Sequence, residues 1–126
     1  MIKRTNAVTG AKEPELFAGE RFGNLTYTIP VPPGKYAVSL YMAERWVGPG
    51  MPGGGGAGSR LFDILCNGIA LARDFDIFAR AGGANRALVQ TFHGLQPDHQ
   101  GRFVLSLLPA KNFALVNAIE VTDESK

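Results

Sequence analysis

The sequence is poor in cysteine, since Cys66 is the only one among 126 residues. A single cysteine excludes an internal disulfide, and no cysteine and histidine residues recur at the spacing of a zinc site. Cys66 lies in the apolar segment 61–66, where the simplest prediction is a small buried core residue. We expect neither a bound metal nor a cofactor.

Long apolar runs and clusters of one charge are also missing. No apolar run approaches the roughly 20 residues that a membrane-spanning helix needs, and the first residues lack the pattern of a signal peptide. The net charge is +2 and the basic residues are scattered, so no basic stripe predicts nucleic-acid binding. We expect neither a membrane nor a nucleic acid as a partner. Taken literally, these absences favour the cytoplasm; a domain of a larger exported protein would look the same, so the compartment stays open.

Helical periodicity is absent, apart from a short turn expected near residues 75–81. In its place, apolar and polar residues alternate with the period of two that is typical of half-buried strands. The alternating segments are 25–31, 36–46, 60–66, 69–78, 87–95, 102–110 and 113–123. The dipeptide Asn67-Gly68 between two apolar segments predicts a hairpin. Several strands separated by Gly/Pro turns indicate an all-β, antiparallel sandwich or barrel.

The length fits one domain, residues 1–126, and the hydrophobic content of 45% is enough for a core. Residues 1–15 are mixed and weakly patterned, and we expect them to form a loose N-terminal arm. The only tryptophan, Trp46, stands where strand 36–46 breaks off into a glycine-rich loop over 48–58. Such a ring either closes the end of the core or offers a surface to a ligand.

Five sequence blocks, in order, resemble the malectin family of carbohydrate-binding domains. They are ERFGNLTYTIPVPPGKYAVSLYMAE, SRLFDILCNG, FDIF, the AG that follows, and VNAIEV. The resemblance covers residues 16–122 and implies a jelly-roll β-sandwich without catalytic machinery. It further implies that eukaryotic relatives bind glucose-containing oligosaccharides, and that bacterial ones are often joined to glycoside hydrolases or other exported proteins. The family's first strands would precede Met1 by spacing, which implies either a shortened fold or a sheet completed by a partner chain.

The resemblance also implies a binding site. A family aromatic, often tyrosine, corresponds to Phe22, and a family aromatic pair corresponds to Trp46 and Val47, so one ring of the pair is retained. An acidic residue before the last strand corresponds to Asn112, whose amide can still bond a hydroxyl. Sugars present flat C–H faces ringed by hydroxyls, so a site for them needs rings beside short polar groups. Glu44 and Arg45 stand next to Trp46 and complete such a set.

Several of these residues have a plainer interpretation. Tyr41 lies opposite Leu40 and Met42 on its strand and either lines the same surface or packs on the sheet face. Phe22 is either a core residue or a ligand contact, and Asn112 is either a ligand contact or a turn residue. Phe113, beside Asn112, is expected in the core.

The acidic and histidine residues carry weaker hypotheses. Asp74 and Asp76 are two apart and could bind calcium or act as acid and base, but no third acidic ligand is close in sequence. A hydrogen-bonded structural role is favoured for Asp63. His93 and His99 flank GLQPD and are predicted to be turn histidines, because no nucleophile accompanies them. The run GGGGAGS lacks the ending of a phosphate-binding loop.

We therefore expect non-catalytic carbohydrate binding, with an oligosaccharide or polysaccharide ligand, at Trp46, Phe22, Asn112, Arg45, Glu44 and Tyr41. One alternative is an assembly module that has lost glycan binding and forms a homodimer through an exposed sheet edge. A glycoside hydrolase is the third hypothesis, and it rests only on scattered carboxylates and histidines.

Overall fold

The computed structural model describes residues 2, 3, 17 and 19–125. Its strands and its helix follow the order β1 (Ile2–Lys3), β2 (Gly19–Gly23), β3 (Leu25–Pro30), β4 (Tyr36–Met42), β5 (Leu61–Cys66), β6 (Ile69–Phe75), α1 (Ile77–Ala81), β7 (Leu88–Leu95), β8 (Arg102–Lys111), β9 (Ala114–Val116) and β10 (Ala118–Asp123). The N-terminal arm expected over residues 1–15 lies outside the described residues, except for Ile2 and Lys3.

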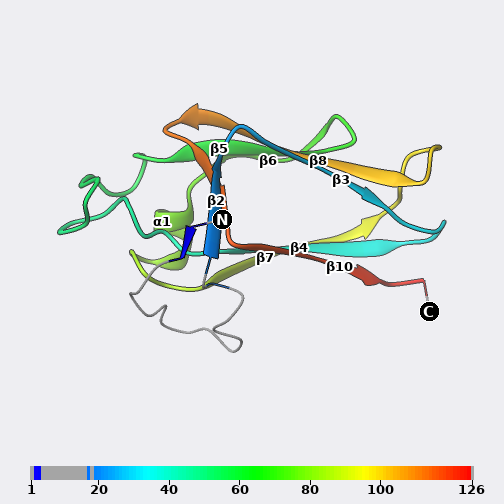
Figure 1. Ribbon diagram of the computed structural model, residues 1–126, viewed down its shortest axis with the longest axis horizontal. Coiled ribbons are helices and arrows are strands. Elements are labelled where there is room, and N and C mark those ends of the chain that lie inside the picture. The colour runs from blue at the N-terminus through cyan, green and yellow to red at the C-terminus, as the bar shows by residue number, and fades with distance from the viewer. Residues whose placement is uncertain (1, 4–16, 18, 126) are drawn as a thin grey trace.

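The strands form two facing layers, joined at one end by a third small sheet (Figure 1). One layer has the strand order β3-β8-β5-β6, the other has the order β10-β4-β7, and the small sheet has the order β1-β2-β9. Every pair of neighbouring strands is antiparallel. The antiparallel β-sandwich is therefore confirmed, whereas the jelly-roll connection remains a prediction.

The core lies between the two layers, and the alternation in the sequence predicts which side chains fill it. In β5, Phe62, Ile64 and Cys66 are buried while the residues between them are partly exposed. The facing strand β4 contributes Leu40 and Met42, both fully buried. Burial raises the pKa of the Cys66 thiol, so this residue is a small apolar core group at neutral pH, as expected.

The hairpin between β5 and β6 confirms the Asn67-Gly68 prediction. Asn67 has a φ of 51° and Gly68 a φ of 80°, which is the left-handed pair that a tight two-residue turn requires. The Asn67 side chain accepts a hydrogen bond from the Val104 backbone N–H at 2.7 Å. The short turn expected near 75–81 is helix α1, capped by Asp76 and Gly82.

Two of the differences from the predicted strands lie at Asn117. The strand expected over 36–46 ends at Met42, and the strand expected over 113–123 is broken at Asn117 into β9 and β10. The buried Asn117 side chain accepts from Ala43 N–H at 2.8 Å and donates to the Gly19 carbonyl at 2.7 Å. One amide thus replaces ladder bonds where the chain leaves the sheet, and it turns residues 43–47 toward the end of the sandwich.

Helix α1 spans five residues, and no helix among residues 2, 3, 17 and 19–125 is long and apolar enough to cross a membrane.

Candidate functional site

A cleft of about 230 Å³ opens at the end of the sandwich that carries the glycine-rich loop. Its walls come from β2, from the residues after β4, and from the turn between β8 and β9, which are far apart in sequence. The residues that line it are Glu20, Phe22, Trp46, Arg60, Asn112, Phe113 and Leu115. Three of the residues expected to bind a ligand, Trp46, Phe22 and Asn112, are thus brought together.

Three aromatic rings stand at the cleft with their surfaces open to solvent. The exposed fraction is 43% for Trp46, 43% for Phe22 and 55% for Phe113. The Phe22 and Phe113 ring centroids lie 6.1 Å apart with the planes tilted by 39°, so these two rings form one continuous apolar surface. Trp46 and Phe22 therefore do not close the core.

The expectation that Phe113 is a core residue is wrong. Asn112, which precedes it, adopts a left-handed φ of 60°, and its Oδ1 accepts a hydrogen bond from the Phe113 N–H at 2.9 Å. This turn interrupts the alternation of β8, so Phe113 points outward although apolar residues follow it. An Asn that favours the left-handed region is the sequence signal that could have revealed this. Asn112 is thus a turn residue that also lines the cleft.

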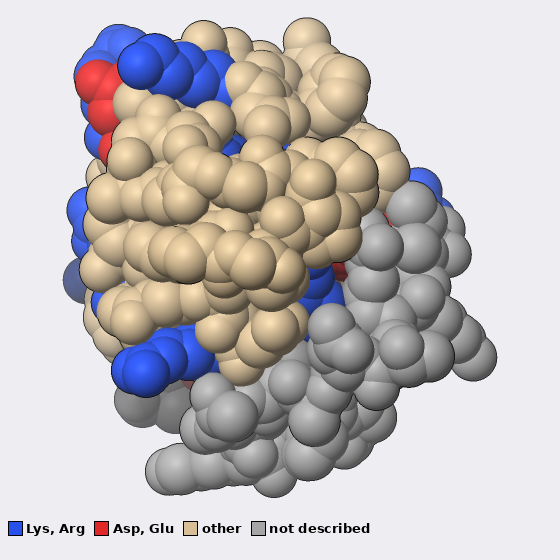
Figure 2. Space-filling model, turned by 90° about the vertical axis from the view of Figure 1, so that its left-hand side faces the viewer, with Lys and Arg blue, Asp and Glu red and all other residues tan. Residues whose placement is uncertain are grey.

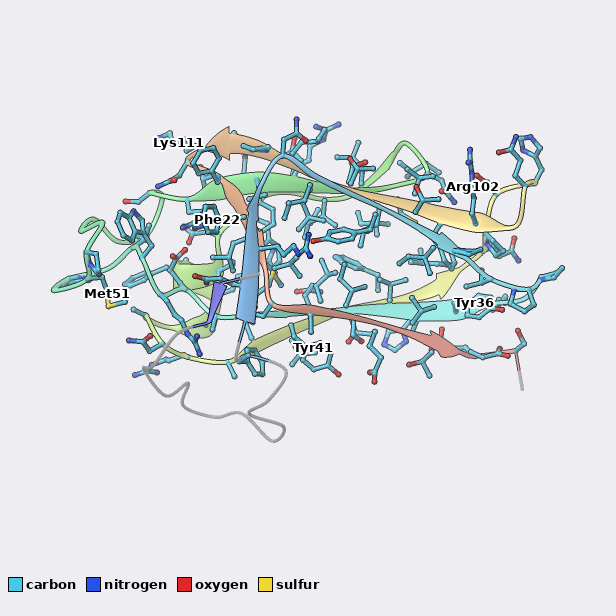
Figure 3. All side chains as sticks on the ribbon, viewed as in Figure 1. Phe22, Tyr36, Tyr41, Met51, Arg102 and Lys111 are labelled. Atoms are coloured by element: carbon cyan, nitrogen blue, oxygen red, sulfur yellow. The ribbon has the colours of Figure 1, made fainter. Side chains whose placement is uncertain are left out.

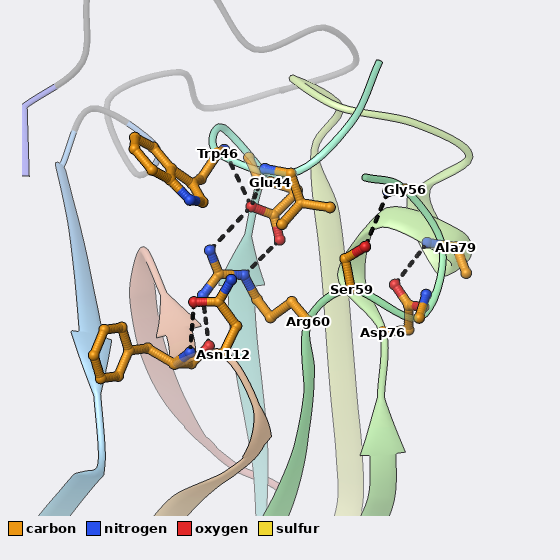
Figure 4. A network of polar contacts seen from close by, with 12 residues as sticks. Glu44, Trp46, Gly56, Ser59, Arg60, Asp76, Ala79 and Asn112 are labelled. Atoms are coloured by element: carbon orange, nitrogen blue, oxygen red, sulfur yellow. Dashed lines mark hydrogen bonds and ion pairs between the residues drawn. The ribbon is translucent and has the colours of Figure 1, made fainter. Parts of the chain in front are cut away.

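A buried ion pair connects the two walls of the cleft (Figure 4). The Arg60 Nε donates to Glu44 Oε1 at 2.6 Å, and its Nη2 donates to Glu44 Oε2 at 3.2 Å. The same Glu44 Oε2 accepts the backbone N–H groups of Trp46 and Val47 at 3.1 Å each. Arg60 Nη1 donates in turn to the carbonyl of Phe113. Glu44 thus holds the backbone of the tryptophan wall, while Arg60 holds that of the phenylalanine wall.

The glycine-rich loop packs against the back of the indole. Gly53 N–H donates to the Trp46 carbonyl at 2.7 Å, and Gly48 N–H donates to the Gly54 carbonyl at 2.8 Å. A Cβ at Gly53 would come closer than 3.0 Å to Nε1, Cδ1 and the carbonyl oxygen of Trp46. Glycine is therefore required at this position by contact with the tryptophan.

The remaining predicted site residues lie elsewhere. Glu44 is fully buried, and its carboxylate accepts hydrogen bonds from Arg60 and from the backbone of Trp46 and Val47. Arg45 is also buried and is not among the described residues that line the cleft. Tyr41 projects from the outer face of the β10-β4-β7 sheet (Figure 3), where its hydroxyl donates to Glu120 Oε1 at 3.0 Å.

Of the two carboxylates considered for metal binding or acid–base chemistry, Asp76 has structural partners and Asp74 is exposed. Asp76 caps α1 by accepting from Ala79 N–H at 3.0 Å, and it accepts from Gly58 N–H at 2.6 Å. Asp63 accepts from Asp74 N–H at 2.9 Å, as favoured from the sequence. Within the described residues, no group of three or more His, Cys, Asp and Glu is arranged to hold a metal ion.

A larger cavity of about 800 Å³ lies where the β3–β4 and β7–β8 loops meet the last residues. No phenylalanine, tyrosine or tryptophan lines it among the described residues, although His99 does. His93 is in β7 rather than in a turn, and its Nδ1 lies 2.7 Å from Glu124 Oε2. The Gly94 N–H and then His93 hold the pKa of Glu124 below its usual value. This cavity offers no ring on which a sugar could stack.

The protein is an antiparallel β-sandwich with three exposed aromatic rings around a cleft at one end. Its family follows from its sequence. The Malectin domain model matches residues 2–99, so the chain belongs to the malectin-domain family. Among curated proteins, no sequence matches this chain.

Solved structures share the fold at low sequence identity. The plant receptor-like kinase ANX2 is 15% identical, with a TM-score of 0.79 over 97% of this chain and 37% of that chain. The β-glucuronidase 2 of Bacteroides uniformis is 16% identical, with a TM-score of 0.77 over 96% of this chain and 13% of that chain. A chain in the crystal structure of the plant peptide RALF23 in complex with FER and LLG2 is 18% identical, with a TM-score of 0.75 over 94% of this chain and 36% of that chain. The chain thus spans only a minor part of each of these proteins.

The contact between Gly53 and Trp46 generates a prediction about the position of the indole. We expect Gly53→Ala to displace the ring, because the added methyl group cannot fit beside Nε1 and Cδ1. The emission maximum of the single tryptophan should shift, and this can be measured by fluorescence in the native protein.

The matched control is Gly54→Ala in the same loop. Gly54 has a φ of 60°, so alanine strains the backbone there, but its Cβ would meet nothing within 4 Å. An equal spectral shift in both variants would show that loop strain, and not contact with the indole, moves the ring.

The buried pair generates a prediction about stability. Glu44→Gln leaves Arg60 as a buried charge without its counter-ion, and breaking such pairs lowers the free energy of unfolding by about 3–5 kcal/mol. Urea denaturation measures this change. The control is Arg73→Ala, which removes an exposed pair with Asp63 at 3.3 Å and should change stability by less than about 1 kcal/mol. Equal effects would contradict a special role for the buried pair.

Proposed function

We propose that this chain is a non-catalytic carbohydrate-binding module and that the cleft at the loop end is its site. The observation that carries the proposal is the convergence of three exposed rings, from three separate segments, around one cleft. Membership of the malectin-domain family supports the same class of function. The ligand in this proposal is an oligosaccharide or a polysaccharide.

Each wall of the cleft has a role that follows from its chemistry. Trp46 on one side and the Phe22–Phe113 pair on the other offer flat apolar surfaces to the C–H faces of a sugar ring. Asn112 at the rim supplies an amide that both donates and accepts hydrogen bonds. Glu44 is a positioning residue, because its carboxylate accepts a hydrogen bond from the backbone N–H of Trp46. Arg45 and Tyr41 have no contact role in this proposal.

The affinity for a sugar should be modest. Hydroxyl groups exchange bonds with water for bonds with the protein, so each hydrogen bond contributes only about 0.5–1.5 kcal/mol. Such a module is useful when it is joined to other domains, because tethering raises the effective concentration at a glycan surface. The structural neighbours are much longer than this chain, which supports a place within a larger protein, and we propose that this protein is exported.

The central test removes the tryptophan ring. Trp46→Ala should weaken binding to any glycan that the native protein selects on a glycan array by about 30-fold or more, since a central aromatic contact contributes about 2 kcal/mol. Calorimetric titration measures the affinity. Because the indole is 43% exposed, the variant should remain folded, which thermal unfolding checks.

The control is Ile69→Ala in the hairpin between β5 and β6. Ile69 is 69% exposed, so this variant also removes an exposed apolar side chain, but away from the cleft. Unchanged glycan binding in Trp46→Ala would refute the proposed site, and a native protein that binds no glycan would refute the function.

A second candidate function is self-association, and the strand order favours it. In the described part of the chain, β3 and β10 are terminal strands of their sheets on the same side of the sandwich. Terminal strands present backbone groups that can pair with a second copy. If this function holds, light scattering gives twice the chain mass, and Val121→Pro in β10 restores the monomer. Glu124 N–H donates to the Lys35 carbonyl beside β4, so by alternation the Val121 N–H faces the open edge, where a proline cannot donate to a new ladder. A native monomer at high concentration would exclude it.

A further inference from the structure

Two charged side chains line the cleft without being exposed. Glu20 is 1% exposed and Arg60 is 4% exposed, yet both contribute to the cleft wall. Glu20 lies two residues before Phe22 on β2, and residues two apart point to the same side of a strand. The exposed ring thus marks the rim of the cleft and the buried carboxylate its closed end.

Arg60 has donors beyond those that bind its partners in the protein. A guanidinium carries five N–H groups. Nε and Nη2 each donate one hydrogen bond to Glu44, and Nη1 donates one to the Phe113 carbonyl. These three bonds leave one N–H on each terminal nitrogen, in a side chain that lines the cleft and whose position the ion pair fixes.

Glu20 supplies the opposite capacity. A carboxylate only accepts hydrogen bonds, and its two oxygens offer about four lone-pair sites. A contact with the protein therefore leaves acceptor sites for a ligand. The closed end of the cleft combines a fixed donor and a fixed acceptor, both shielded from bulk water.

We propose that Glu20 and Arg60 bind two adjacent hydroxyl groups of a single sugar ring held between Trp46 and the Phe22–Phe113 pair; this inference rests on the proposed function. A hydroxyl both donates and accepts, so one can accept from Arg60 while its neighbour donates to Glu20. The ligand is then a terminal, unsubstituted residue of a glycan that has a free vicinal diol.

The dimensions of the cleft restrict the ligand to about one ring. Its volume of about 230 Å³ lies below the roughly 300–1,000 Å³ that hold a drug-sized molecule. Buried charged groups at the closed end also prevent a chain from running through it. A polysaccharide would therefore be bound at its end and not along its length.

Charge further restricts the ligand to a neutral sugar. The Arg60 charge is balanced by Glu44 at 2.6 Å, so it attracts an anion weakly. The carboxylate of Glu20 would lie beside any carboxylate or sulfate on the bound ring and repel it. Among the described residues seen from this end, uncharged ones fill most of the surface and basic side chains lie mostly at its margins (Figure 2). Neutral hexoses fit this site better than uronic acids.

The first test changes the acceptor and keeps its shape. Glu20→Gln replaces one carboxylate oxygen by an NH₂ group, so a ligand hydroxyl loses its acceptor, and affinity should fall about ten-fold or more. Glu120→Gln is the matched control, because Glu120 is exposed on β10 and its Oε1 accepts from Tyr41. Titration of an array-selected glycan should give native affinity for Glu120→Gln. Native affinity for Glu20→Gln, in a protein where Trp46→Ala has lost binding, overturns this inference and leaves the proposed function standing.

The second test needs no variant and so does not depend on the folding of Glu20→Gln. The methyl glycosides of glucose, galactose and mannose, and methyl glucuronide, are each tested as competitors of the array-selected glycan. We expect one neutral methyl glycoside to displace the glycan completely, with an affinity within about ten-fold of it, and methyl glucuronide to fail. If no single-ring glycoside competes, or if the glucuronide competes best, the inference is wrong. If Trp46→Ala loses glycan binding but no methyl glycoside competes, only the single-ring site is refuted and the proposed function stands.

Discussion

The ion pair between Glu44 and Arg60 is the interaction on which the cleft depends. A sandwich end is made of loops, and loops that diverge from different strands have no reason to keep a fixed separation. Here one carboxylate holds the backbone of residues 46 and 47, and the guanidinium bound to it holds the carbonyl of residue 113. The pair is buried, so its strength depends little on salt. Two walls from distant segments are thereby kept at a spacing that neither could set alone.

The glycine-rich loop has a related role that its composition does not suggest. A run with seven glycines between residues 48 and 58 looks like a flexible linker. In the structure it turns back on itself through backbone hydrogen bonds, and Gly53 lies close to the Nε1 and Cδ1 atoms of the indole. Asp76 fixes the far end of the run at the start of α1. The loop therefore packs against the tryptophan. Glycine is needed at Gly53 because any side chain there would collide with the indole.

Sequence patterns predicted the sheets better than the site. Alternation over 25–31 and 61–66 identifies strands because a sandwich buries every second residue, and Asn67-Gly68 identifies its hairpin because few other pairs adopt that turn. Trp46 stands out as the single tryptophan at the end of an expected strand, whereas Phe22 is indicated only by the family resemblance. Phe113 was misplaced, since a local turn at Asn112 overrides the alternation. Glu20 gives no signal at all, because its burial in the cleft depends on how β2 packs against segments that are distant in sequence, around Trp46, Arg60 and Leu115. The pairing of Glu44 with Arg60 is hidden in sequence for the same reason.

The position of the cleft relative to the last described residues has a consequence for how the domain can be mounted. The C-terminal strand β10 runs away from the glycine-rich loop and ends at the opposite end of the sandwich (Figure 1). Any polypeptide attached after β10 would extend from the pole opposite the aromatic rings. Anchored in this orientation, to a bead or to a fused enzyme, the domain would present its open rings outward, unobstructed by whatever carries it.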